Sequence, residues 1–356
     1  MNKRKFLQTL LATGGVVLVA KRYVPAGSDA PGTVPQPLTV PTTTDPAPDA
    51  SSPTLAESNA KEEFELMMLQ ESELRPGFKH SERSQAGEVV IQQLPNESVD
   101  QYLEKIRNFD KTFASDIFLR DENSKLLLPT VARLDRIQNF VGHANFNLIS
   151  YEEILYFARN YPEIGKFEKA EIDFMNEIFL ADATTYGFFG EKITPDFNHR
   201  ILQKDVVKID GTGHYLMRGE SLAHYQQIHK DVGSELTLTS GIRNNVKQMH
   251  LFLAKTFQAE GNLSRASRSL APPGHSFHGL GDFDVGKVGM GEQNFTADFA
   301  ATKEYRRLIN LGYVDIRYTD TNKFGVRYEP WHIKIENNSI AQCSHSHDGG
   351  SSPCTA

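Results

Sequence analysis

Basic charge, cysteine and long apolar runs are all scarce in this chain of 356 residues. It has 38 Lys and Arg against 45 Asp and Glu, and the net charge of -7 offers no basic surface of the kind that nucleic acid requires. We therefore expect no nucleic-acid partner. The main apolar run spans residues 6–20, which is shorter than the roughly 20 residues that a membrane-spanning helix needs.

The two cysteines, Cys343 and Cys354, both lie in a C-terminal tail of residues 337–356 that is predicted to be flexible. In an oxidising compartment they could close a small loop, and the sequence leaves their pairing open. His345 and His347 lie beside Cys343 and could also bind a metal ion. A short tail rich in Gly and Ser is more typical of a solvated chain end, and we favour that interpretation.

Residues 1–25 have the layout of an export signal or a membrane anchor. Lys3, Arg4 and Lys5 precede the apolar residues 6–20. The same stretch resembles a twin-arginine signal in which lysine replaces the first arginine. No clean small-x-small cleavage site follows directly, so a cleaved signal and a retained membrane tether both stay open. We expect a periplasmic or cell-envelope location, with the twin-arginine route as a candidate.

Residues 26–60 are predicted to form a disordered linker. They consist mainly of Pro, Thr, Ser, Ala and Asp, and they contain too few large apolar residues to bury a core. A signal followed by such a linker is what an exported enzyme working away from the membrane surface would use.

The next region, residues 61–204, is predicted to be mostly helical. Its apolar residues recur at helical spacing, and capping boxes mark helix starts at Ser98 with Gln101 and at Ser150 with Glu153. The same periodicity predicts helices over 129–140 and around 167–179. We expect the aromatic residues of these helices to pack in a core rather than to line a cofactor pocket.

Residues 205–336 are predicted to form an α+β domain. Short extended segments separated by glycines begin near Val206 and alternate with helices. This order predicts a small, mainly antiparallel sheet with flanking helices, preceded by the helical region. The expected helices are 221–230, 246–257 and 302–311, and the expected strands are 206–209, 212–219, 235–240, 313–318 and 325–335.

The glycine-rich segment 273–286 concentrates residues that could carry chemistry, namely His275, His278, Asp282 and Asp284. Glycines let the backbone fold tightly and bring side chains together. His and Asp suit Zn²⁺ in a site with three protein ligands and one open position. An isolated His or Asp in such a loop is more often a turn former than a ligand, so this segment alone does not establish a metal site.

A second motif, Glu329-Pro-Trp331-His332, contains the single tryptophan of the chain. A catalytic zinc site needs a third ligand, and it needs a carboxylate that does not bind the metal but can take a proton from the metal-bound water. The second motif can supply both parts. The two motifs together therefore favour a zinc hydrolase more strongly than either does alone.

With these motifs the sequence resembles the VanY-type D-alanyl-D-alanine carboxypeptidases and their relatives, the VanX-type dipeptidases and the phage L-alanyl-D-glutamate endopeptidases. The family's Ser-Gly-Tyr-Arg-Ser stretch is similar to residues 240–244, and its Pro-Gly-x-Ser-x-His is matched at 273–278. Its Glu-Pro-Trp-His is reproduced at 329–332. The resemblance covers about residues 205–336 and implies a zinc DD-peptidase, or hedgehog-like, fold.

The resemblance also implies roles for individual residues. Three residues would bind Zn²⁺, and Glu329 would act as the general base. Arg243 would hold the substrate or polarise its carbonyl, although a structural ion pair is the plainer interpretation of an arginine. The implied metal ligands are His278, Asp284 and His332, and the implied substrate contacts are Arg243, Ser276 and Trp331.

One departure from the family pattern affects the metal ligands. The family places its aspartate seven residues after the histidine, whereas Asp284 lies six residues after His278. A shift of one residue on a strand turns a side chain to the other face. Either the loop after Gly281 absorbs the change, or His275 and Asp282, which have the spacing of seven, take part instead. We favour Asp284, because the apolar-Gly pair of the family follows it.

The resemblance implies a zinc-dependent carboxypeptidase that trims the terminal D-alanine from peptidoglycan stem peptides by attack of a metal-activated water. Two alternatives stay open. One is an endopeptidase or dipeptidase of the same zinc class. The other is a catalytically idle cell-wall-binding homologue, which the short spacing suggests and Glu329 argues against, because a binding protein has no use for a base. His214 could line the cleft, but we favour a plain loop histidine at this position.

Overall fold

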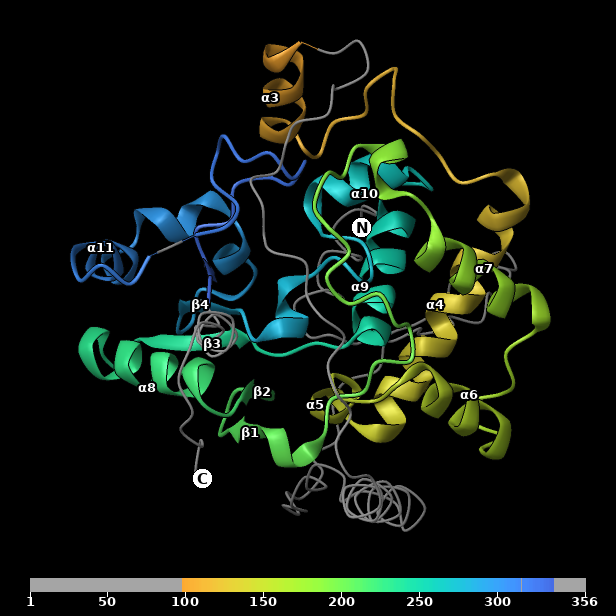
Figure 1. The fold of residues 1–356 in the computed structure, drawn as a ribbon, viewed down its shortest axis with the longest axis horizontal. Helices are drawn as coiled ribbons and strands as arrows, with labels where there is room; N and C mark the ends of the chain where they lie inside the picture. Colours follow the sequence, from red (N-terminus) through yellow and green to blue (C-terminus); the bar gives the residue numbers. More distant parts are fainter. Residues whose placement is uncertain (1–97, 315, 336–356) are drawn as a thin grey trace, which may run out of the picture.

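The computed structural model of the chain describes residues 98–314 and 316–335 (Figure 1). The predicted signal, the linker and the cysteines of the tail lie outside the described residues. Within the described part of the chain, no helix is both long enough and apolar enough to cross a membrane.

The first half of the described chain is helical. Both predicted capping boxes are present, with Ser98 accepting from the backbone of Gln101 and Ser150 from that of Glu153. Each box satisfies backbone N–H groups that the first helical turn leaves without partners. The helices are α3 (Val99–Arg107), α4 (Asp121–Val141), α5 (His143–Phe146), α6 (Tyr151–Asn160) and α7 (Lys169–Leu180).

The helix predicted over 129–140 begins earlier than expected, at Asp121, and Pro129 lies inside it. Asp121 and Glu122 occupy the first turn, where negative charge is favoured by the helix dipole. A proline removes a hydrogen bond and strains a helix, but the buried side chains on both sides of Pro129 outweigh that cost here. The helix therefore continues through the proline.

The second half contains two small antiparallel sheets, which confirms the predicted α+β class. Strand β1 (Val206–Ile209) pairs with β2 (His214–Met217), and a three-stranded sheet has the order β3-β4-β5. The strands of the second sheet are β3 (Leu236–Ser240), β4 (Phe283–Lys287) and β5 (His332–Ile333). The helices are α8 (Glu220–Val232), α9 (Asn245–Gln258), α10 (Leu263–Ser269) and α11 (Lys303–Asn310), and a short 3-10 helix, η3, spans Phe277–Leu280.

The two strands predicted over 313–318 and 325–335 are largely wrong. In the described residues between α11 and Trp331 no strand forms, and only the two residues of β5 pair with the sheet. The two segments instead contact each other through a backbone hydrogen bond from the N–H of Glu329 to the carbonyl oxygen of Tyr318. Side chains of these segments, such as Tyr318 and Val326, are instead buried from loops.

Buried apolar side chains form two clusters. The helical core joins apolar residues of α4, α6, α7, α9 and α10 with a few residues of later loops. Its members include Phe146, Phe174, Met249 and Phe252. The sheet core joins the three-stranded sheet with α8 and α11 and includes Phe283 and Val285. In Figure 1 the sheet, α8 and α11 lie on one side of the molecule, and α4, α6 and α7 lie on the other, with α9 between them.

Candidate functional site

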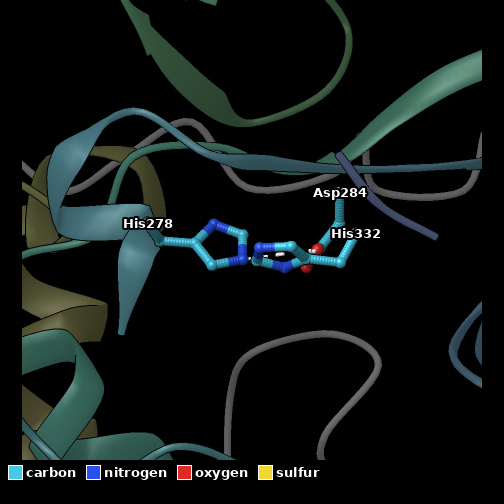
Figure 2. Close-up of side chains that lie close together, drawn as sticks. All are labelled: His278, Asp284 and His332. Carbon is cyan, nitrogen blue, oxygen red and sulfur yellow. Dashed lines mark hydrogen bonds and ion pairs between the residues drawn. The ribbon is translucent and has the colours of Figure 1, made fainter. Parts of the chain in front are cut away.

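The three side chains that the resemblance implies as metal ligands lie close together (Figure 2). One possible ligand atom each from His278, Asp284 and His332 can be chosen so that all lie within 4.8 Å of one another. Oδ1 of Asp284 is 3.3 Å from Nε2 of His278 and 3.1 Å from Nδ1 of His332. All three side chains are buried. Their donor atoms form a group of the size and chemistry that could hold one metal ion.

The turn at Gly281 accounts for the short spacing between His278 and Asp284. His278 lies on η3, and Gly281 ends this helix in the left-handed region at φ 110°, which favours glycine. The chain then enters β4, where Asp284 is paired directly with His332 of β5. Residues opposite each other in an antiparallel pair project from the same face of the sheet. The turn at Gly281 therefore accommodates the missing residue and places Asp284 beside both histidines.

A backbone hydrogen bond fixes the orientation of the His278 ring. Nδ1 lies 2.7 Å from the carbonyl oxygen of Gly241. Because a carbonyl can only accept, the proton of the neutral ring is on Nδ1, and Nε2 faces Asp284 as a free electron-pair donor. Such a bond to the second ring nitrogen is typical of metal-binding histidines.

Asp282 supports His332 rather than joining the group. Its Oδ2 lies 2.9 Å from Nε2 of His332, and its oxygens also accept from Arg317 and from the backbone N–H of Ile335. His275 lies apart, with Nδ1 3.0 Å from the carbonyl oxygen of Gly190. The second-choice pair of His275 and Asp282 is therefore not brought together.

Glu329 lies at the edge of the group and lines the same cavity. Its Oε2 is 4.0 Å from Nδ1 of His332, and its Oε1 is 4.0 Å from Nε of Arg327. Burial raises the pKa of Glu329 to about 7, and the positive charges of Arg327 and His332 oppose that rise. A carboxyl group with a pKa near neutrality can both take up and release a proton there.

Arg243 follows β3 and lines the cavity beside the group. Its backbone N–H donates to the carbonyl oxygen of His278 at 3.3 Å, and its Nη1 donates to Oγ of Ser240 at 3.2 Å. Its Nε is buried without a partner, and among the described residues no carboxylate lies within ion-pair distance of the guanidinium. A structural ion pair therefore does not explain this arginine.

The group opens into a cavity of about 220 Å³. The predicted contacts Ser276 and Trp331 line it, although Trp331 is also packed into the sheet core. The interpretation of His214 as a plain loop residue is wrong, because it lies on β2 and lines the cavity. Sequence patterns gave no sign of several other lining residues, among them His143, Asn147, Lys247, Tyr318 and Arg327.

Comparisons with known proteins agree with the resemblance. The family model VanY, described as D-alanyl-D-alanine carboxypeptidase, matches residues 218–337. Two solved structures show similarity, and no curated protein sequence matches at a significant level.

The first similar structure is a mutant of the vancomycin-resistance D,D-pentapeptidase VanY from a VanB-type resistance cassette in complex with Zn(II). It is 22% identical, has a TM-score of 0.29, and the match covers 40% of this chain and 84% of that one. The second is VanYB in complex with D-alanine-D-alanine, with 23% identity, a TM-score of 0.30, and coverage of 39% and 82%.

Proposed function

We propose that this chain is a zinc-dependent D-alanyl-D-alanine carboxypeptidase that trims peptidoglycan stem peptides, and the match of the VanY family model to residues 218–337 supports this proposal. The observation that carries the proposal is the buried group of His278, Asp284 and His332 with Glu329 beside it in one cavity. Two imidazoles and a carboxylate are a donor set that suits catalytic Zn²⁺ and leaves a position open.

The surroundings of the group fit this metal. Both histidines have their other ring nitrogen engaged, His278 with a backbone carbonyl and His332 with Asp282. Such partners orient metal-binding imidazoles and raise their basicity. Bound Zn²⁺ would supply Lewis acidity, which lowers the pKa of water to about 7 and polarises a carbonyl group.

Glu329 is the residue that would move the proton. Its carboxylate would accept a proton from the attacking water and then give it to the nitrogen of the leaving D-alanine. Burial supports this role because it raises the pKa of Glu329 to about 7. General acid-base catalysis of this kind contributes roughly 10²- to 10⁴-fold to a rate.

Arg243 would act on the carbonyl oxygen of the scissile bond. Its unpartnered Nε and its position in the cavity leave a charged donor free for the negative charge that develops there. Ser240 and the backbone contact with His278 hold the side chain in place without using all of its donors.

The test is the release of D-alanine from a stem pentapeptide that ends in D-Ala-D-Ala, compared with cross-linked muropeptides. We expect release from the free pentapeptide, loss of activity with a chelator, and recovery when zinc is added back. Glu329→Gln should lower kcat at least about 100-fold while zinc content is kept. Glu304→Gln is a matched control, because Glu304 is a buried glutamate outside the cavity.

Three outcomes would contradict the proposal. Release that is insensitive to the chelator would exclude the zinc mechanism. Cleavage only within cross-linked muropeptides would identify an endopeptidase instead. Less than stoichiometric zinc in protein purified without chelators, together with no hydrolysis, would identify an idle binding homologue.

We also propose that the chain acts in the cell envelope. The basic and then apolar order of residues 1–25 supports export, and the proposed substrate is found there. Fractionation of cells that express the full chain would test this. Protein found only in the cytoplasmic fraction would contradict it.

A further inference from the structure

One wall of the cavity is basic, and it contains neither Glu329 nor the residues of the metal group. This basic wall consists of Arg243, Lys247, His143 and His214, all of which line the cavity. Lys247 lies on α9 and is only 3% exposed. Its Nζ donates to Oε1 of Gln138 on α4. Among the described residues, no carboxylate lies within ion-pair distance of Lys247.

A buried ammonium group without an anion is unfavourable, because water no longer solvates it and no partner replaces the water. Burial together with the neighbouring Arg243 lowers the pKa of Lys247 to about 7. The nearest acidic influence is Asp135, but this carboxylate is already bonded to Nε2 of His250 at 2.7 Å. An anion that entered the cavity would supply the missing partner.

The other cations of the cavity are placed differently. Arg327 lies between the rings of Phe109 and Trp331, and its Nε approaches Glu329 at 4.0 Å. Lys255 also lines the cavity, but it is less buried than Lys247. Its pKa is lowered mainly by burial, and the charged residues that shift it further are Arg327, Arg265 and Asp110, none of which belongs to the metal group. The electrostatic neighbours of His214, by contrast, include Lys247, Arg243 and Asp284. Arg243 connects the basic wall to the metal group, because its electrostatic neighbours include Asp284 and Glu329 and it is itself a neighbour of Lys247.

We propose that Lys247, held by Gln138 and flanked by His143, binds the free terminal carboxylate of the substrate. This inference rests on the proposed function and names the residue that would restrict cleavage to the end of a peptide. Gln138 and His143 precede residues 218–337, and Lys247 lies outside the three motifs. The helical region would therefore complete the substrate site, since it supplies the partner of Lys247 and part of the wall beside it.

The chemistry of the two charges supports this assignment. A carboxylate is a compact anion that an ammonium group binds through a short, charge-assisted hydrogen bond. In a buried site such a bond is stronger than in water, and an uncharged amide in the same place cannot replace it. A carboxypeptidase must make this distinction between a free terminus and a continuing chain.

The test is calorimetric titration of zinc-loaded Glu329→Gln protein, which should bind without turnover, with N-acetyl-D-alanyl-D-alanine and with its C-terminal amide. We expect the acid to bind roughly 10- to 100-fold more tightly than the amide. Introducing Lys247→Met into the Glu329→Gln protein should reduce the ratio of the affinities for the acid and the amide to near one. Lys247→Arg should keep part of this preference. Adding Gln138→Leu should lower the ratio less than Lys247→Met does.

Lys192→Met is the matched control, because Lys192 is a partly buried lysine that bonds to the carbonyl of Phe179 outside the cavity. It should leave the ratio unchanged. Zinc content and thermal unfolding of each variant show whether it is folded. The inference is overturned if Lys247→Met keeps the preference for the acid, if Lys255→Met removes it instead, or if neither compound binds.

The outcome separates this inference from the proposed function. If the unmodified protein releases no D-alanine but Glu329→Gln protein still prefers the acid through Lys247, the proposed function fails and the carboxylate site stands. If the unmodified protein releases D-alanine and the preference does not depend on Lys247, the carboxylate site fails and the proposed function stands.

Discussion

The two walls of the cavity are held in different ways. On the metal side, His278 and His332 each have both ring nitrogens near an oxygen atom, and these contacts come from the sheet, η3 and the adjoining loops. On the basic side, Nε of Arg243 has no partner and the ammonium of Lys247 has only an uncharged one. The first wall is preorganised by its own contacts, whereas the second has donors left for a ligand.

The two walls also belong to different cores. Asp284 and His332 lie on β4 and β5, whose apolar residues pack in the sheet core. Lys247 lies on α9, whose apolar face packs in the helical core with α4. The matched region 218–337 therefore contains pieces of both cores. The cavity depends on how the two cores are held together.

The largest effect should follow from removing the helical region. A chain that starts at residue 205 would leave the apolar face of α9, including Val246, Met249 and Phe252, without the helices that cover it. We expect this fragment to lack a cooperative thermal transition, because it loses most of the helical core. Circular dichroism during heating is the measurement. A chain that starts at residue 98 is the control and should unfold cooperatively.

If the fragment from residue 205 unfolds in one sharp transition and binds zinc, the two cores are independent. The difference between the two walls would then arise within residues 205–336 alone.

Single substitutions in each core should separate stability from metal binding. Phe252→Ala removes a fully buried ring of the helical core and should lower the free energy of unfolding by about 3–5 kcal/mol. Phe283→Ala in the sheet core should cost a similar amount and should also weaken zinc binding, because Phe283 precedes Asp284 on β4. Urea unfolding and zinc titration below the transition measure the two effects. Equal loss of zinc affinity in both variants would contradict this division.

Acid should destabilise the protein through buried histidines, of which His275 packs against Phe188 of the helical core. Burial lowers the pKa of His275 to about 4 from an ordinary value of 6.5. The unfolded chain therefore binds more protons between these values, so this contribution is complete above about pH 6.5 and is lost as the pH falls toward 4. The loss should reach roughly 3 kcal/mol.

His275→Gln keeps a donor for the carbonyl of Gly190 but cannot titrate. Urea unfolding at pH 7 and pH 4.5 should show a smaller decrease in stability for this variant than for the unmodified chain. The prediction fails if both proteins lose the same stability over that range.

The smallest predicted effect concerns the partner of His332. Asp282→Asn should weaken zinc binding about 10- to 100-fold, because Asp282 orients the ring without joining the group. Asp284→Asn should remove stoichiometric zinc altogether, and the exposed Asp298→Asn should have no effect. Zinc competition titrations would measure all three. A greater loss in Asp282→Asn than in Asp284→Asn would reverse the assignment of these two carboxylates.

Much of the local structure could be predicted from short-range patterns. The capping boxes at Ser98 and Ser150 and the strand over Leu236–Ser240 depend on residues within a few positions of each other. The α+β class followed from the order of such elements. The strand predicted over 313–318 was wrong because a local sequence pattern does not show whether a neighbouring strand is available to pair.

The predicted ligands could be named because each lies in a motif with its own local pattern. Lys247 and His143 could not, since their relation to the cavity depends on how α9 packs against α4 and α5, far apart in the sequence. Nothing in the residues around Lys247 distinguishes it from a solvated lysine. The sequence left open whether the turn at Gly281 accommodates the short spacing or whether His275 and Asp282 take part instead. In the structure the turn places Asp284 opposite His332, a pairing between strands that local patterns do not reveal.

Gly241 limits which sequences this fold could accept without losing its metal group. A β-carbon at this position would lie 2.0 Å from the carbonyl oxygen of Tyr215, so β2 and the loop after β3 could not stay in contact. The same loop offers the carbonyl of Gly241 to Nδ1 of His278. A single added methyl group would therefore separate the hairpin from the loop and release a metal-binding ring, although residue 241 is not itself a ligand. In a library of variants, this glycine should tolerate replacement as poorly as the histidine that it holds.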